Sequence, residues 1–74
     1  MTDRASPKGW VIRVTNPRQG RPPSVDIYDV AIADAADAVA AVRRASRAAH
    51  DAIVETIAEL PVGTDLRDGE VRLR

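Results

Sequence analysis

Arginines in the N-terminal third of the chain have the side-chain chemistry that binds phosphate or carboxylate. Arg18 and Arg21 lie in the segment Asn16–Pro23, which holds no acidic residue, and Arg13 precedes them in a run of β-branched residues. A guanidinium group donates paired hydrogen bonds to such anions. These three residues are therefore the candidate phosphate- or anion-binding site.

A wider basic surface would include Arg72 and Arg74 near the C-terminus. With Trp10 or Tyr28 exposed beside it, such a surface would bind single-stranded nucleic acid by stacking. We favour a simpler interpretation, in which Asn16–Pro23 is a solvated loop. Its positive residues are then arginines only because the chain uses arginine in preference to lysine.

His50 is the only histidine, and it lies beside Asp51. A catalytic histidine needs a nucleophile or a second acid that converges on it, and the sequence indicates neither. We expect a surface histidine, no catalytic residue and no enzymatic activity.

Four carboxylates lie close together in the middle of the chain: Asp26, Asp29, Asp34 and Asp37. Such a cluster suits a hard cation, but the spacing and the glycine of a calcium loop are missing. The chain has no cysteine, which excludes thiolate ligands. We expect no metal and no cofactor.

The segment Asp34–Leu60 predicts one long amphipathic helix. Asp34 is suited to cap its start, Pro61 to end it, and neither glycine nor proline interrupts it. The larger apolar residues, with Ser46 filling one gap, recur every three or four positions, as on one face of a helix: Val39, Val42, Ala49, Ile53, Ile57 and Leu60.

A second stripe of small residues runs beside the first and would permit close approach of a partner helix: Ala38, Ala41, Ala45, Ala48 and Ala52. Alanine is also simply favourable in helices and tolerable on surfaces. The charges favour the partner. Arginines precede acids along this segment, the wrong order for the dipole of a single helix. Two antiparallel copies would place each arginine cluster beside the partner's acids.

The composition is that of a small chain without covalent cross-links. Its 74 residues include no cysteine and no phenylalanine, and the formal net charge is +0. Small domains of this kind often enlarge their core by oligomerising. Zero net charge argues against the basic footprint of most nucleic-acid binders. No apolar run reaches the roughly 20 residues of a membrane span, and the N-terminus lacks a signal-like apolar region. We expect a cytoplasmic protein with no membrane contact.

These patterns predict an α+β fold, in which a mainly antiparallel three-stranded sheet in β-β-α-β order carries one long helix on one face. The expected segments are a flexible tail 1–8 and one domain 9–74, with strand 9–15, loop 16–23, strand 24–33, helix 34–60, turn 61–69 and strand 70–74.

Two strand faces are specified within this scheme. Trp10, Ile12 and Val14 should pack on the helix, and the indole N–H should find an acceptor. In the second strand, Val25 and Ile27 should face the core, and a bulge or a face switch near Asp29–Val30 should then turn Val30 and Ile32 inward. The expected function is a non-enzymatic protein-interaction domain that self-associates as a homodimer through its helix or docks on a protein partner. Nucleic acid is the alternative, which we do not favour.

Overall fold

The computed structural model describes residues 7–74. Its elements are β1 (Trp10–Arg18), β2 (Arg21–Val30), α1 (Ala35–Ser46), β3 (Ile53–Glu59) and β4 (Val71–Leu73). All strand pairs are antiparallel, in the order β3-β1-β2-β4. The α+β class is confirmed, but the sheet has four strands and not three. The predicted flexible tail falls largely outside the described residues.

The start of the helix is as predicted. The Asp34 carboxylate caps α1 by accepting a hydrogen bond from the backbone N–H of Asp37 at 3.0 Å. The end is wrong. α1 stops at Ser46, because Arg47 adopts a left-handed backbone (φ 53°) and its N–H turns back to the carbonyls of Arg43 and Arg44.

The second half of the predicted helix is strand β3. Four of its seven residues, Ile53, Val54, Thr56 and Ile57, are β-branched, and such side chains fit a pleated sheet better than a helix. β3 pairs with β1 from Trp10 to Thr15. One extra residue, Ile57, interrupts this ladder as a bulge.

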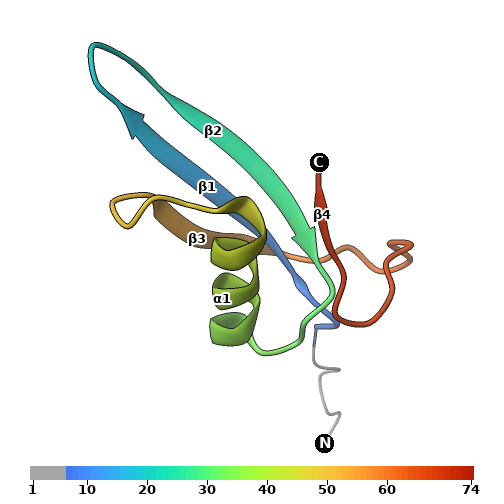
Figure 1. Ribbon diagram of the computed structural model, residues 1–74. Helices are drawn as coiled ribbons and strands as arrows, with labels where there is room; N and C mark the ends of the chain where they lie inside the picture. Colours follow the sequence, from blue (N-terminus) through green and yellow to red (C-terminus); the bar gives the residue numbers. More distant parts are fainter. Residues whose placement is uncertain (1–6) are drawn as a thin grey trace, which may run out of the picture.

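The predicted loop Asn16–Pro23 is also wrong, because β1 and β2 continue through it. A two-residue turn, Gln19-Gly20, joins them, and Arg18 pairs with Arg21 directly below the turn. Gly20 supplies the positive φ (70°) that the turn requires. Figure 1 shows the result, a long hairpin whose tip extends beyond the rest of the sheet.

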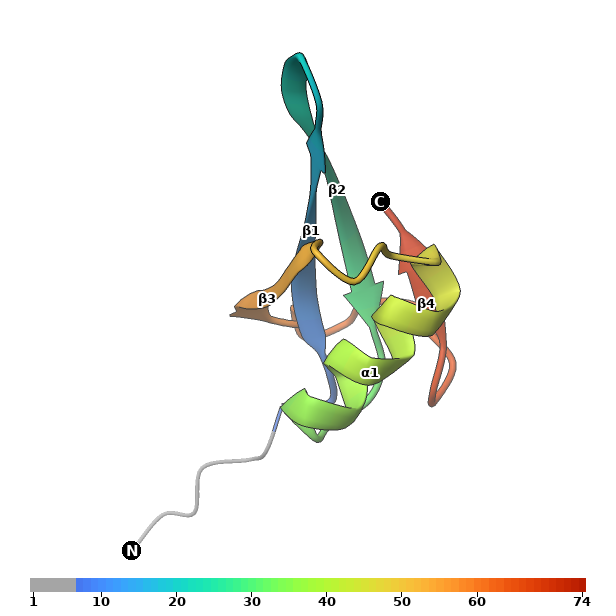
Figure 2. The same ribbon diagram turned by 60° about the vertical axis from the view of Figure 1, so that its left-hand side comes forward.

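α1 lies across one face of the sheet, as Figures 1 and 2 both show. There Ile12 and Val14 of β1, fully buried, meet Ala38 and Val42 of α1. Trp10 packs against this core, and its indole N–H donates to the carbonyl of Ala33 at 2.9 Å. Both expectations for the first strand are confirmed.

The expected bulge at Asp29–Val30 does not form. β2 keeps one register against β1 from Ser24 to Val30. Tyr28 and Val30 therefore share the face covered by α1, while Val25 and Ile27 point to the opposite face. The polar Asp29 suggested a switch of faces, but it lies on the face away from α1, where its carboxylate pairs with Arg74 at 2.7 Å.

The connection from β3 to β4 links the two edges of the sheet. It is held at the base of the hairpin by hydrogen bonds from Leu60 N–H to Gly9 O (3.0 Å) and from Gly69 N–H to Ala31 O (2.8 Å). In Figure 1 it passes behind the hairpin, on the side away from α1. The base is thus covered on both faces. The last strand was predicted correctly, and it forms the short edge strand β4.

Candidate functional site

The free end of the β1–β2 hairpin, residues 16–24, forms a two-stranded ribbon that we call the arm. β1 pairs with β3 only as far as Thr15, and β2 pairs with β4 only from Tyr28 onward. Beyond these points the two strands have only each other as neighbours in the sheet. Figure 2 shows the arm standing clear of the other elements.

Prolines occur on both strands of the arm. The register shift between Asn16 and Arg18 sets Pro17 of β1 against Pro22 and Pro23 of β2. Proline has a fixed φ and no N–H, so it is tolerated in a sheet only at bulges and unpaired edges. The prolines do not exclude strands here, because the arm has no third strand that would need their N–H groups.

Two of the three candidate anion-binding arginines meet at the tip of the arm. Arg18 and Arg21 are paired across the strands, which sets their Cβ atoms about 5 Å apart. Within residues 7–74 neither guanidinium has a hydrogen bond or ion pair. They present two adjacent, exposed positive charges.

Arg13 does not join them. It lies five residues before Arg18, about 16 Å along the strand, and its Nη2 pairs with Glu55 Oε1 at 2.6 Å. Arg72 pairs with Glu70 at 3.0 Å and Arg74 with Asp29 at 2.7 Å. The wider basic surface suggested by the sequence is therefore neutralised by acids everywhere except in the arm.

The face of the sheet away from α1, which we call the outer face, carries exposed aliphatic side chains. Val25, Thr15 and Ile53 form one row across β2, β1 and β3, and Ile27, Arg13 and Glu55 form the next. Val25 is 53% exposed and Ile53 is 56% exposed. Sequence reasoning missed both, placing Val25 in the core and Ile53 on a helix. Uninterrupted alternation through Tyr28 and Val30 was the signal for Val25.

The alanine stripe is not one continuous surface. Ala38 and Ala52 are buried in the core of the chain itself, and Ala48 packs against that core. Ala48 and Ala52 also lie beyond the end of α1. Only Ala41 and Ala45 remain on the helix with some exposure, too little for the helix–helix contact that the sequence suggested.

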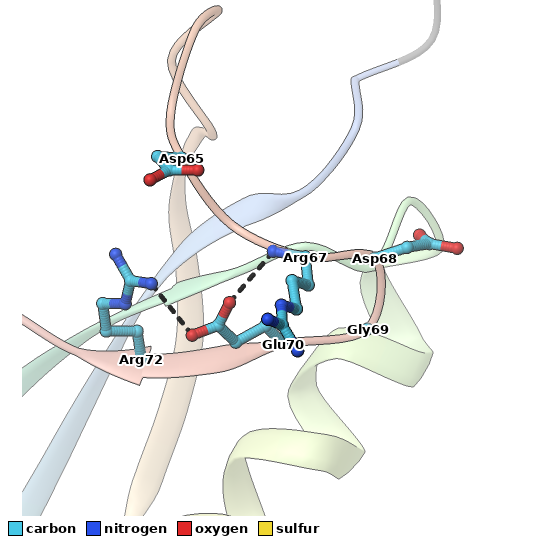
Figure 3. A pocket seen from close by; sticks show the side chains of 6 residues that line it. All are labelled: Asp65, Arg67, Asp68, Gly69, Glu70 and Arg72. Atoms are coloured by element: carbon cyan, nitrogen blue, oxygen red, sulfur yellow. Dashed lines mark hydrogen bonds and ion pairs between the residues drawn. The ribbon is translucent and has the colours of Figure 1, made fainter.

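A shallow depression of about 760 Å³ lies around the turn before β4, and its lining is charged: Asp65, Arg67, Asp68, Gly69, Glu70 and Arg72. Figure 3 shows the Glu70 carboxylate between two donors. The Arg67 backbone N–H at 2.9 Å, and then Arg72 Nη2 at 3.0 Å, lower the pKa of Glu70. This carboxylate is already occupied by contacts that shape the turn, and Figure 3 shows Asp65 and Asp68 pointing away from it and from each other, so the acidic groups do not converge on one point.

The remaining candidates for chemistry are dispersed. His50 is exposed in the segment between α1 and β3. Among residues 7–74 no three His, Cys, Asp or Glu side chains gather as a metal site. Asp34 is used in capping α1 and Asp29 in pairing with Arg74.

Comparisons with protein-family models, with curated proteins and with solved structures found no match to this chain. No helix in the described part of the chain is long and apolar enough to cross a membrane.

Proposed function

We propose that this chain is a small, non-enzymatic protein-interaction domain, expected in the cytoplasm, that forms a two-fold homodimer through the outer face of its sheet. The unequal burial of the two sheet faces carries the proposal. Ile12 and Val14 under α1 are 0% exposed, whereas Val25 and Ile53 on the outer face are more than half exposed. Exposed aliphatic clusters of this kind mark contact surfaces.

The charges of the outer face are self-complementary. Arg13 and Glu55 form a cross-strand pair, each with 44% of its side chain exposed. A two-fold axis parallel to the strands, midway between β1 and β3, stacks Arg13 of one subunit over Glu55 of the partner subunit. The same operation stacks Thr15 over the partner's Ile53. Two antiparallel sheets packed in this way form a sandwich.

The magnitudes limit any dimer to weak affinity. Each half-exposed Val or Ile retains about half of the roughly 1.5–3 kcal/mol available from full burial. Exposed ion pairs add about 0–1 kcal/mol. Association itself costs at least about 4 kcal/mol. In this arrangement Ile53, packed on the partner's Thr15, supplies the affinity, and the charges set the register.

Sedimentation velocity tests the proposal over a concentration series that reaches about 1 mM, where an association of only about −4 kcal/mol populates the dimer. We expect wild type to shift from monomer to dimer. Ile53→Glu should remain monomeric, because the new charge would be buried against the partner.

Leu73→Glu is the matched control. Leu73 is 57% exposed, close to the 56% of Ile53, but it pairs with Tyr28 on the face that carries α1. This variant should dimerise like wild type. A monomeric wild type throughout the series would overturn the proposal, as would equal loss of dimer in both variants.

A further inference from the structure

The arm separates charge in a chain that is neutral overall. Residues 14–25 contain two arginines and no acid, while the whole chain has 11 basic and 11 acidic residues. The rest of the chain therefore carries nine basic against eleven acidic side chains. The net charge of zero is thus the sum of a positive arm and a mildly negative remainder of the chain. The argument from composition against a polyanionic partner therefore does not apply to the arm.

The tip also bears an electrostatic cost that nothing within the described chain relieves. Like charges directly opposite each other on paired strands are destabilising. The nearest acid along β2, Asp26, lies five residues from Arg21, about 16 Å away. Each of the three arginines on the body of the sheet has an acidic partner at 3.0 Å or less. An external anion would relieve the repulsion at the tip.

The arm is preorganised for such a ligand. Pro17 against Pro22 and Pro23 restricts the backbone of both strands. Conformational entropy lost on binding is correspondingly reduced. Asn16, Gln19 and Ser24 add neutral hydrogen-bonding groups beside the arginines.

The geometry selects duplex over single-stranded nucleic acid. Single strands are held by stacking bases on aromatic side chains. Both aromatic residues, Trp10 and Tyr28, lie near the base of the hairpin and pack against the core under α1, not on the arm. A two-stranded ribbon, by contrast, fits the major groove of B-DNA, about 12 Å wide.

We infer that the arm is a binding site for duplex DNA, in which the ribbon enters a groove and Arg18 and Arg21 each contact a backbone phosphate. Phosphate contacts of this kind position a protein without reading sequence. This site goes beyond the proposed self-association and uses residues outside the proposed dimer surface.

Fluorescence anisotropy with a labelled mixed-sequence DNA duplex tests the inference. Two phosphate contacts predict a slope of about −1.8 in log K against log salt, a loss of about tenfold in affinity between 50 and 200 mM salt. The Ile53→Glu variant isolates a single arm. If wild type binds as a dimer through both arms, its log K should fall more steeply with log salt than that of Ile53→Glu. DNA binding by the monomeric variant does not depend on dimerisation, so the two proposals can fail separately.

The substitutions are matched in charge. Arg18→Gln with Arg21→Gln should weaken binding at least tenfold at about 50 mM salt and flatten the slope. Arg44→Gln with Arg47→Gln removes the same charge from exposed positions at the end of α1 and should leave binding unchanged. Arg18→Lys with Arg21→Lys should retain most of the affinity, because lysine also binds phosphate.

The inference would be overturned by no salt-dependent binding to the duplex, by equal losses in the two glutamine variants, or by preference for a single strand of the same length. Stronger binding to poly-glutamate than to the duplex would also overturn it, since the arm would then be a site for acidic protein. Far-UV circular dichroism of each variant verifies that the fold is retained.

Discussion

The base and the tip of the β1–β2 hairpin are built from the same two strands under opposite constraints. At the base, Ile12 and Val14 lie fully buried between β-neighbours and α1. At the tip, the prolines and arginines of the arm have no third strand, helix or loop against them. One continuous hairpin thus serves as core at one end and as a free projection at the other.

This difference separates residues that stabilise the fold from residues that are open to a ligand. The buried side chains at the base, Ile12, Val14 and Val30, hold the fold together and are closed to a ligand. Side chains of the arm add little to folding and are all accessible. Substitutions in the two regions should therefore have effects of very different size, and the comparison can be tested position by position.

The largest contrast should come from truncating side chains. Ile12→Ala removes buried methyl groups from the core, and we expect it to lower the free energy of unfolding by about 2–5 kcal/mol. Gln19→Ala at the exposed turn should change it by less than about 0.5 kcal/mol. Urea denaturation followed by circular dichroism measures both. An Ile12→Ala effect as small as that of Gln19→Ala would refute the division.

The two glycines of the hairpin provide a second, smaller contrast. A Cβ added at Gly9 would lie 1.9 Å from the backbone oxygen of Val30. Gly9→Ala must therefore displace β2, at a cost of about 1–3 kcal/mol. At Gly20 a Cβ would meet nothing within 4 Å, and only the φ of 70° is unfavourable, which costs about 1 kcal/mol.

Asparagine distinguishes the two causes in the same denaturation experiment. Gly20→Asn should be less destabilising than Gly20→Ala, because asparagine tolerates a left-handed backbone. Gly9→Asn should be no less destabilising than Gly9→Ala, because its Cβ meets the same carbonyl. A smaller loss with Gly9→Asn would show that the base is less tightly packed than the structure indicates.

The smallest effect concerns the turn that leads into β4 at the base. Hydrogen bonds from Arg67 and Arg72 lower the pKa of Glu70 below its ordinary value of 4.5. A depressed carboxyl pKa stabilises the fold above the unfolded value, and that contribution is lost as the pH falls through the folded value. Wild type should exceed Glu70→Gln in stability at neutral pH, and the difference should shrink below pH 4.5. A constant difference from neutral to acidic pH would contradict this assignment.

The sequence was sufficient for the elements whose signals are local. Alternation fixed β1 and its buried face, the cap at Asp34 fixed the start of α1, and Asp68-Gly69 preceded the last strand as expected. It failed where two periodicities overlap. Ile53, Ile57 and Leu60 recur at helical spacing, yet they stand in or beside a strand. Pairing with β1, a partner some 40 residues away, decided between the two.

One misread signal was present in the charges. Arg43, Arg44 and Arg47 before Asp51 and Glu55 are in the wrong order for a helix that continues to Leu60. They are in the right order for one that ends at Ser46, because the arginines then lie at the negative end of the dipole. The arm was missed for a different reason. Prolines normally argue against strands, and only tertiary structure shows that this ribbon has no neighbour to pair with.

The extra residue at Ile57 affects how readily a strand of another molecule can add to the edge of the sheet. β3 is an edge strand rich in β-branched residues, the kind of segment on which strands from other molecules add to grow fibrils. The bulge breaks the even spacing of the N–H and C=O groups that an incoming strand would have to match. This irregularity therefore makes β3 a poorer template for an added strand than a regular edge strand would be.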